Sequence, residues 1–306
     1  MQRFKTLLQR EWMQHRTAWL VMMAAPFVLL LLIVVFGSWR IHADNFTPLQ
    51  DLDGRLSPLG LAILATGATA YLTLFLVWMA NLLQTPGLAR RDLQDRSIEF
   101  WLSLPAGHAQ SLSATLLMHL WLVPIAAMAA GLAGGLLLAV VLVVKVSGFS
   151  ALWALPGAAI VLAALAGLAS TALGLVLATL WLSPLILGTM AASSWLKRWG
   201  LAAVIGAVFI GHVLLAKLYG VTVVGDTVTT WLSQANAALL GQGGRGLLPG
   251  AENIADLERA LRGFPQWELQ SAGVAFAQLA SPIFLLALLF AAAAFGLLVL
   301  RRQRGA

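Results

Sequence analysis

The chain has 306 residues, of which 60% are hydrophobic and only 10% are charged. Soluble domains carry about 25% charged residues, because polar side chains must cover their surface. The composition therefore excludes an ordinary soluble enzyme, a disordered chain and a fibrous protein, and it indicates a polytopic α-helical membrane protein with room for about six spans. The sequence holds no cysteine, which excludes disulfides, thiolate nucleophiles and cysteine-ligated zinc.

Six long apolar segments predict six transmembrane helices in an all-α fold. They cover residues 18–38, 58–83, 114–144, 156–193, 200–218 and 273–300. A signal peptide is the alternative for the first segment, but its apolar run is longer than the roughly 7–15 residues of a signal-peptide core. The fourth segment is too long for one straight span, so Ser183-Pro184 predicts a bend in one long helix that overshoots the bilayer.

The distribution of charge predicts the orientation of the chain. With the N-terminus inside, the cytoplasmic segments are 1–17, 84–113, 194–199 and 301–306, and they carry 12 of the 19 Lys and Arg residues against four acids. Cytoplasmic loops are enriched in Lys and Arg, so both termini are predicted to be cytoplasmic. The net charge of +7 then reflects membrane topology and not nucleic-acid binding. We expect the whole chain to form a single transmembrane domain.

The pattern of residues 1–17 predicts an amphipathic helix that lies in the membrane interface. Phe4, Leu7, Leu8 and Trp12 share one helix face. The opposite, polar face carries Arg3, Lys5, Thr6, Gln9 and Arg10. A basic face of this kind is attracted by anionic lipid headgroups. A generic cytoplasmic leader is the alternative.

The inner segment 84–113 is predicted to hold a short helix between two turns. The turns are Thr85-Pro86-Gly87 and Pro105-Ala106-Gly107. Asp92 and Arg96 are spaced to pair along the helix, which fits a solvated loop with self-paired charges. However, the run IEFWLSLP offers more apolar surface than a lone cytoplasmic loop should expose, so we expect a partner or the membrane edge to cover it.

The outer segment 219–272 predicts two short helices on the outer membrane surface or over the ends of the spans. Asp226 is placed to cap the first helix. The second helix carries Ile254, Leu257 and Leu261 on one face and is predicted to end at Gly263. Trp267 then anchors the entry to the last span.

Common catalytic and nucleotide-binding motifs are absent from the sequence. No G-x-x-x-x-G-K-[ST], H-E-x-x-H or G-x-S-x-G occurs, so we expect no enzymatic activity, metal site or cofactor in this chain. No Asp or Glu lies inside the six predicted spans, which argues against ion-coupled transport. His119 and His212 are the strongly polar residues well within spans, either as pathway residues or as neutral side chains hydrogen-bonded between helices.

Small residues spaced four apart predict close helix contacts in the third and fourth spans. The pairs are Gly131 with Gly135, Gly167 with Thr171, and Ser170 with Gly174. Small side chains let helix backbones approach closely. We expect these two spans to pack on each other or to form a subunit interface.

The order of these elements resembles the permease subunit of ABC-2 type exporters (type-2 ATP-binding-cassette exporters). The run RRDLQDRSIEFWLSLPAGHAQSLSATLL is similar to that family's inner loop, in which D-x-S-x-x-F-W-x-S-L-P precedes the third span. The matching residues are Asp95, Ser97, Phe100, Trp101, Ser103, Leu104 and Pro105. The run LWLSPLILGTMAASSWLKR also resembles the end of the family's fourth span, although the fourth and outer segments here are long.

The resemblance implies that the inner loop is a coupling helix that docks on a separate ABC ATPase subunit. Phe100, Trp101 and Leu104 would be its apolar anchors. Asp92, Asp95, Arg96 and Glu99 would form its polar rim. ATP and Mg would bind in the ATPase, and two permease chains, identical or related, would form one translocation pathway in the lipid bilayer.

The expected function is therefore that of a membrane-spanning permease subunit of an ABC exporter in a bacterial plasma (inner) membrane. Because small and apolar residues dominate the spans, the expected substrate is hydrophobic or amphipathic, such as a lipid, a peptide or a drug-like molecule. One alternative is an ion-coupled secondary carrier. The other is a non-transporting membrane scaffold or sensor, in which the inner loop binds a signalling partner.

Overall fold

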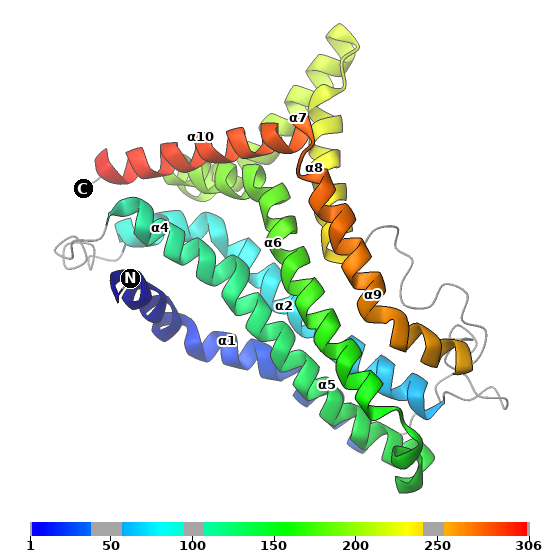
Figure 1. The fold of residues 1–306 in the computed structure, drawn as a ribbon. Coiled ribbons are helices and arrows are strands. Elements are labelled where there is room, and N and C mark those ends of the chain that lie inside the picture. Colours follow the sequence, from blue (N-terminus) through cyan, green and yellow to red (C-terminus); the bar gives the residue numbers. More distant parts are fainter. Residues whose placement is uncertain (1, 38–56, 95–106, 241–253, 305–306) are drawn as a thin grey trace.

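The computed structural model describes residues 2–37, 57–94, 107–240 and 254–304, and within these residues the fold is all-helical (Figure 1). The first half comprises α1 (Gln2–Phe36), α2 (Pro58–Gln94), α4 (His108–Leu117), the π-helix η3 (Met118–Leu122), α5 (Val123–Ser147) and the short η4 (Phe149–Ala154). The second half comprises α6 (Gly157–Leu196), η5 (Lys197–Trp199), α7 (Gly200–Tyr219), α8 (Val223–Leu240), α9 (Ile254–Gln278) and α10 (Pro282–Arg304). The predicted all-α class is confirmed.

Five helical runs among the described residues are long and apolar enough to cross a membrane. They are Phe4–Phe36, Pro58–Ala89, His108–Ser147, Gly157–Tyr219 and Pro282–Gln303. The fourth run contains both α6 and α7, so the predicted fourth and fifth spans are joined in one run that is interrupted at η5. The multi-pass character is therefore supported, while the count of six spans and the orientation of the termini stay predictions.

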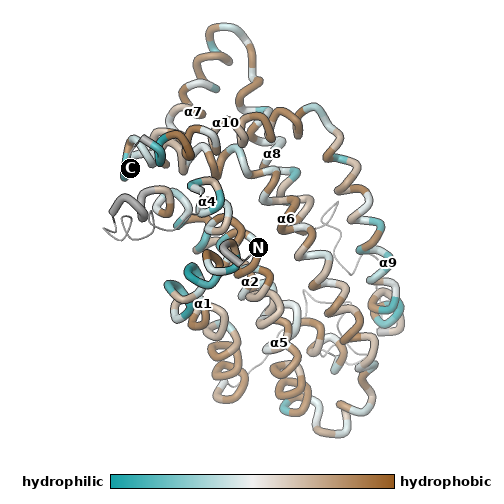
Figure 2. The backbone as a smooth tube through the Cα atoms, turned by 60° about the vertical axis from the view of Figure 1, so that its left-hand side comes forward, coloured by the Kyte–Doolittle hydropathy of each residue, from teal (hydrophilic) through white to brown (hydrophobic). Residues whose placement is uncertain are grey.

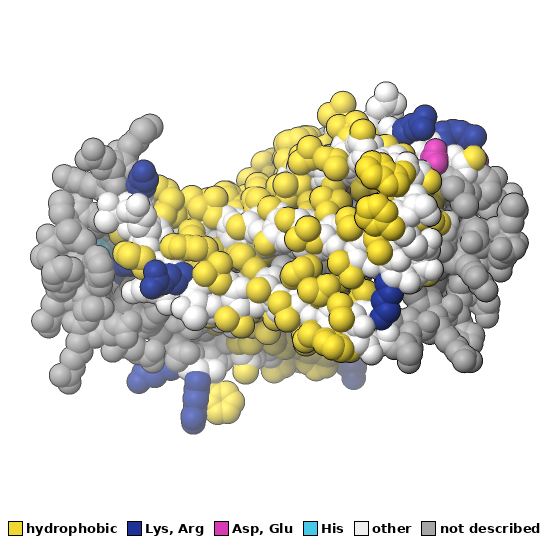
Figure 3. Space-filling view, turned by 90° about the horizontal axis from the view of Figure 1, so that it is seen from below, with side chains coloured by type: hydrophobic (Ala, Val, Ile, Leu, Met, Phe, Trp, Pro, Cys, Tyr) yellow, Lys and Arg dark blue, Asp and Glu magenta, His cyan; other side chains and the backbone are white. Residues whose placement is uncertain are grey.

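Apolar side chains cover most of the outside of these helices, as expected where lipid is the solvent. Figure 2 shows long hydrophobic stretches along the helices, with hydrophilic residues gathered toward their ends. On the face drawn in Figure 3, hydrophobic side chains fill the middle, and Lys and Arg lie toward both ends. α7 is an extreme case, because Gly200 is its one buried residue.

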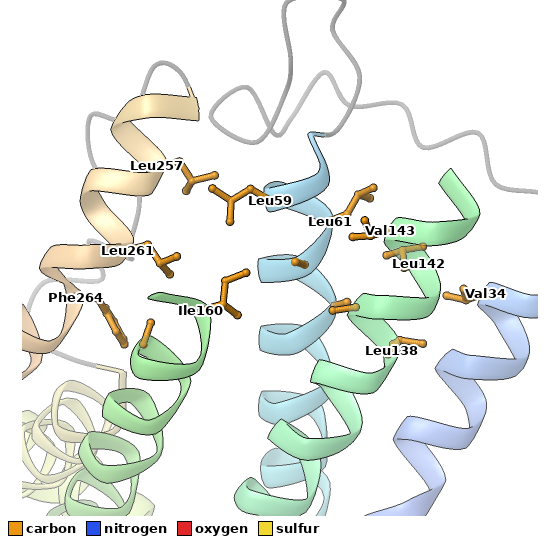
Figure 4. Packing of buried hydrophobic residues seen from close by; sticks show 14 residues of the cluster. Val34, Leu59, Leu61, Leu138, Leu142, Val143, Ile160, Leu257, Leu261 and Phe264 are labelled. Carbon is orange, nitrogen blue, oxygen red and sulfur yellow. The ribbon is translucent and has the colours of Figure 1, made fainter. Parts of the chain in front are cut away.

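The ends of four helices meet at one end of the bundle. The start of α1, the end of α2, the start of α4 and the end of α10 lie together there (Figure 1). The opposite end holds the end of α1, the start of α2 and the start of α9. There, Val34, Leu59 and Leu257 belong to one buried apolar cluster (Figure 4).

Further apolar clusters fill the rest of the bundle. Large aromatic side chains dominate the cluster around α6, where the Trp181 and Phe284 rings meet edge to face, 4.8 Å apart. Such pairs contribute about 0.5–1.5 kcal/mol beyond their buried area. Trp231 of α8 is buried in the same cluster. Since α8 also packs along α6, it is an integral part of the bundle.

Glycines of α5 let this helix approach α2 very closely. A Cβ built on Gly135 would lie 2.8 Å from Thr66 Cα, and one on Gly131 would lie 2.9 Å from Ala70 Cα. The expectation of close contact at these glycines is confirmed, but the expected partner is wrong: they face the second apolar helix and not the fourth. On α6, Gly174 instead packs against the Ala238 carbonyl of α8.

The N-terminal helix is continuous with the first apolar run. α1 extends without a break from Gln2 to Phe36, so the predicted interfacial helix is its first part and not a separate element. The predicted apolar face packs inward, with Leu7 buried and Trp12 against the protein. The placement of Arg10 on the solvated face is wrong, because Arg10 is buried beside a fully buried Glu11.

Two prolines lie inside helices that they were expected to end or bend. α2 runs through Pro86 to Gln94, so the predicted turn at Thr85-Pro86-Gly87 is wrong. α6 runs through Pro184 as one helix of 40 residues, as predicted, which is about 60 Å or twice the hydrocarbon thickness of a bilayer.

The residue before each of these prolines supplies a replacement hydrogen-bond donor. A proline lacks the N–H that would bond to the carbonyl four residues earlier. The Thr85 hydroxyl donates to the Leu82 carbonyl (2.7 Å), which is the carbonyl that Pro86 leaves without its helical donor. The Ser183 hydroxyl donates in the same way to Leu180 (2.6 Å) ahead of Pro184. Each hydroxyl thus replaces the missing donor.

The segment before the last span is helical, with different limits from those predicted. Asp226 lies in the first turn of α8, where its carboxylate accepts a hydrogen bond from the Thr222 hydroxyl (2.6 Å). Leu257 and Leu261 of α9 are buried, as their spacing predicts. The predicted stop at Gly263 is wrong, since α9 continues to Gln278. The last apolar helix then begins at Pro282, a residue suited to a first helical turn.

Candidate functional site

A cluster of polar side chains, buried except for the half-buried His15, lies between α1, α2 and the α4–η3 helix. We call it the Glu11 cluster, and it consists of Arg10, Glu11, His15, Asn81, Thr115 and His119. Glu11, Asn81 and His119 are each 0% exposed. Ionisable groups are rarely buried between apolar helices without a structural or functional reason.

The Glu11 carboxylate is held by donors from its own helix and from α4. The Arg10 guanidinium donates to Glu11 Oε1 over 2.6 Å, with the two side chains 9% and 0% exposed. The Thr115 hydroxyl is also within donating distance of Oε1, at 3.1 Å. The Arg10–Glu11 pair is neutral overall, which reduces the cost of burying both charges.

His119 enters the cluster from the π-helix. The Val123 N–H bonds to the Met118 carbonyl, five residues back, at a point where Pro124 follows in the chain. A proline disfavours regular α-helical bonding in the turn before it, and single π-turns are a common result at functional sites. His119 Nδ1 lies 3.0 Å from the Thr115 carbonyl. A ring protonated at Nδ1 donates to that oxygen and leaves Nε2 as the basic nitrogen.

The Trp19 ring packs against both histidines. Trp19 lies 5.2 Å from both the His15 and His119 ring centroids, and the two imidazoles are 5.3 Å apart. The Trp19 indole N–H donates to Asn81 Oδ1 of α2 (3.3 Å). The cluster thereby connects α1 to α2 as well as to η3.

The Glu11 cluster also contains the residue types of a metal site. One ligand atom from each of Glu11, His15 and His119 lies within 4.8 Å of the others, and two histidines with one carboxylate are a common zinc-ligand set. However, Arg10 already neutralises the carboxylate, so a divalent ion would add uncompensated charge to a buried site. We therefore interpret the cluster as a set of polar interactions that hold these helices together.

The sequence-predicted site residues fall in three places. His119 is in the Glu11 cluster. His212 lies on α7 against α8, where a Cβ on Gly225 would be 2.6 Å from its Cε1, so the structure does not bring the two histidines together. The predicted docking residues Asp95, Arg96, Glu99, Phe100, Trp101 and Leu104 lie outside the described residues, and Asp92 is described only as part of the α2 backbone.

Glu11 is the principal residue that sequence reasoning missed. Its sequence signal is a spacing: Glu11, His15 and Trp19 are four residues apart and therefore share one helix face. Thr115 and His119 repeat that spacing on the facing helix. No acidic residue was expected inside a span, but Glu11 is buried inside Phe4–Phe36, the first helical run that is long and apolar enough to cross a membrane. That expectation is wrong for this helix.

A cavity of about 200 Å³ lies between α2, α6, α8 and α9. We call it the Glu268 cavity, after the half-buried Glu268 of α9. Its polar lining consists of Tyr71, Ser170, Thr171, Glu268 and Ser271. α9 is not among the helices long and apolar enough to span a membrane. Burial raises the pKa of the Glu268 carboxyl, and a hydrogen bond with the Ser170 side chain opposes that rise.

A second cavity, of about 330 Å³, lies between the start of α1, the α4–η3 helix and α6. Its lining is almost wholly apolar and includes Phe4, Leu120, Trp121 and Leu180. Such a lining suits a hydrocarbon chain but offers few groups for specific recognition.

No family model, curated protein or solved structure matches this chain.

Proposed function

We propose that the chain is the membrane-spanning permease subunit of an ATP-binding-cassette exporter in a bacterial inner membrane. The observation that carries the proposal is the common end of the bundle described above. The end of α2 and the start of α4 flank the predicted coupling loop, and they lie beside the N-terminal part of α1 and the end of α10 (Figure 1). An energy-supplying subunit bound there would lie beside four helices at once.

Charge at this end supports the same assignment. Lys5 and Arg16 are exposed on α1, and Arg301 and Arg302 lie near the end of α10. The excess of Lys and Arg on one side of a membrane protein marks its cytoplasmic side. ATP and Mg would bind in a partner ATPase, since this sequence has no phosphate-binding motif of its own.

The two cavities support an amphipathic or hydrophobic substrate. One is apolar, and the other combines aromatic rings with a carboxylate. We propose that a dimer of such chains, identical or related, forms the translocation pathway.

Coexpression with the ATP-binding-cassette ATPases of the source organism tests the proposal. We expect this chain alone to hydrolyse no ATP and to copurify with an ATPase. W101A should reduce that copurification and the coupled ATP hydrolysis by about tenfold or more, because a buried aromatic anchor often contributes at least 2 kcal/mol to an interface. W153A is the matched control, since Trp153 is 82% exposed in η4 at the other end of the bundle.

Unchanged assembly and hydrolysis in W101A would show that the docking assignment is wrong. Failure of every ATPase to copurify with the wild-type chain would contradict the exporter proposal itself. A partner without nucleotide-hydrolysis activity would point instead to a membrane scaffold or sensor.

The Glu11 cluster favours a second candidate, an ion-coupled secondary carrier. Buried carboxylate and imidazole groups between helices are the usual components of proton pathways. The cluster lies near the start of α1, ahead of the uncharged stretch of that helix, whereas coupling sites lie near the bilayer midplane. We therefore rank this candidate second. Uptake into proteoliposomes that requires a proton gradient but no ATP would establish it.

A further inference from the structure

The Glu268 cavity combines one carboxylate with aromatic rings and hydroxyl groups. Phe264 and Trp267 of α9 line it with stacked rings, 5.9 Å apart and 21° from parallel. Glu268 lies four residues after Phe264 on α9, so these two side chains share a helix face, and both line the cavity with Trp267. This combination suits a molecule that has an apolar or aromatic body and a cationic head.

Charge within the cavity also favours a cation. Among the described residues that line it, none is Lys, Arg or His, and Glu268 is the one residue with a formal charge at neutral pH. A partly buried carboxylate is stabilised by a compensating positive charge. Hydroxyl groups of Ser170, Thr171 and Ser271 are present as further hydrogen-bond partners for an ammonium group.

The position of the cavity allows contact with a transported molecule. Tyr71 and Thr171 lie well inside α2 and α6, two of the helices that are apolar enough to span the membrane. Close packing of Gly174 against the Ala238 carbonyl brings α6 and α8 together beside the cavity. A ligand here would contact four helices of the bundle.

We propose that the Glu268 cavity binds a small amphipathic amine, with the ammonium group paired to Glu268 and the apolar part against Phe264 and Trp267. The binding site stands on the geometry of the cavity alone. The further statement that such amines are the exporter's substrates rests on the proposed function.

Binding to the purified full chain, reconstituted in lipid nanodiscs without any ATPase, tests the site. The probe is tritiated 2-phenylethylamine, and the matched neutral probe is 2-phenylethanol, in which a hydroxyl replaces the ammonium. We expect saturable binding of the amine and at least about tenfold weaker binding of the alcohol, because the alcohol lacks the charge that pairs with Glu268.

Two variants on the same helix complete the experiment. E268Q keeps the size of the side chain but removes its charge, and it should weaken amine binding by about tenfold or more without affecting the alcohol. E258Q is the control, since Glu258 lies outside the cavity and pairs with Arg262 along α9 (3.5 Å). Size-exclusion profiles and melting temperatures establish that each variant folds.

Three results would each overturn the proposal: no saturable amine binding to the wild type at roughly 10 mM, equal binding of the amine and the alcohol, or equal effects of E268Q and E258Q. Because no ATPase is present, these results are independent of whether the chain belongs to an exporter. Conversely, amine binding with no ATPase partner would retain the site and remove the exporter proposal.

Discussion

Replacing Glu11 by glutamine should strongly destabilise the helix bundle. The substitution keeps the shape of the side chain but leaves the Arg10 guanidinium without its carboxylate in a buried position. Removing one partner of a buried ion pair costs about 3–5 kcal/mol. Because the two side chains are only 9% and 0% exposed, solvent screening is weak. The amide oxygen can still accept from Thr115, so we expect a loss near the lower limit, about 3 kcal/mol.

The R10M/E11L double variant distinguishes the effect of an unpaired charge on stability from the effect of lost packing. It removes both charges together and should cost clearly less than E11Q, since no unpaired charge is left. The measurement is equilibrium unfolding in mixed micelles of increasing SDS content, followed by circular dichroism. E258Q provides the exposed control, with an expected change of about 0.5 kcal/mol or less.

A stability of E11Q within about 0.5 kcal/mol of wild type would refute the reasoning. So would a double variant that is destabilised by at least as much as E11Q, because the loss would then come from packing and not from an unpaired charge.

Four further predictions concern local structure, each measured by the same unfolding assay. G135A should lower the free energy of unfolding by about 1–3 kcal/mol, because its Cβ would meet the α2 backbone at 2.8 Å. G188A is the control: its Cβ would have nothing within 4 Å, so the change should be neutral or stabilising by up to about 1 kcal/mol. Equal effects of the two substitutions would contradict the packing of α5 on α2. K197G should stabilise the chain by about 1 kcal/mol, since Lys197 has a φ of 54° that favours glycine; K197A should not, and a gain from K197A would disprove this account. S183A should cost about 1 kcal/mol through loss of the hydrogen bond to Leu180, and no loss would mean that Pro184 is accommodated otherwise. Burial raises the pKa of Glu268, so this carboxyl ionises at a lower pH in the unfolded chain than in the folded one, and the wild type loses stability as the pH rises through the raised pKa. E268Q should therefore flatten the change in melting temperature between about pH 4 and pH 7. An unchanged slope would exclude Glu268 as the source of that change.

Hydropathy identified most of the architecture, because apolar runs of this length have few alternatives to a helix. The apolar parts of α2, α5, α6 and α10 were all predicted, although the last begins at Pro282 and not at residue 273. The partners of these helices were not predictable, since Ala- and Gly-rich faces fit several neighbours equally well. Gly135 illustrates this point, because its sequence pattern indicates a close contact but does not say with which helix.

The candidate sites were less predictable, because they depend on which helices meet. Glu11 lies seven residues before the predicted first span, which begins at residue 18, and a search for apolar spans therefore assigns it to a solvated leader. Its burial requires α4 to lie alongside α1, as the hydrogen bond from Thr115, 104 residues later in the chain, demonstrates. The Glu268 cavity likewise draws residues from four separate helices. The predicted coupling residues from Asp95 to Leu104 stay a prediction.

Prolines begin some helices of this chain and lie inside others, so proline alone did not fix the helix boundaries. Pro58 and Pro282 begin helices, as residues without a backbone donor do well in the first turn. Pro86 and Pro184 lie inside helices, and in both a hydroxyl residue precedes the proline and donates to the carbonyl that the proline leaves without its helical donor. In an apolar environment an unsatisfied carbonyl costs several kcal/mol, so this local compensation stabilises α2 and α6 across their prolines. A preceding hydroxyl does not by itself predict a continuing helix, because Ser57 and Ser281 precede the prolines that begin α2 and α10, and Pro26 lies inside α1 after Ala25. The boundary therefore depends on the surrounding residues, and α2 continues beyond Pro86 to Gln94, toward the proposed ATPase-docking loop.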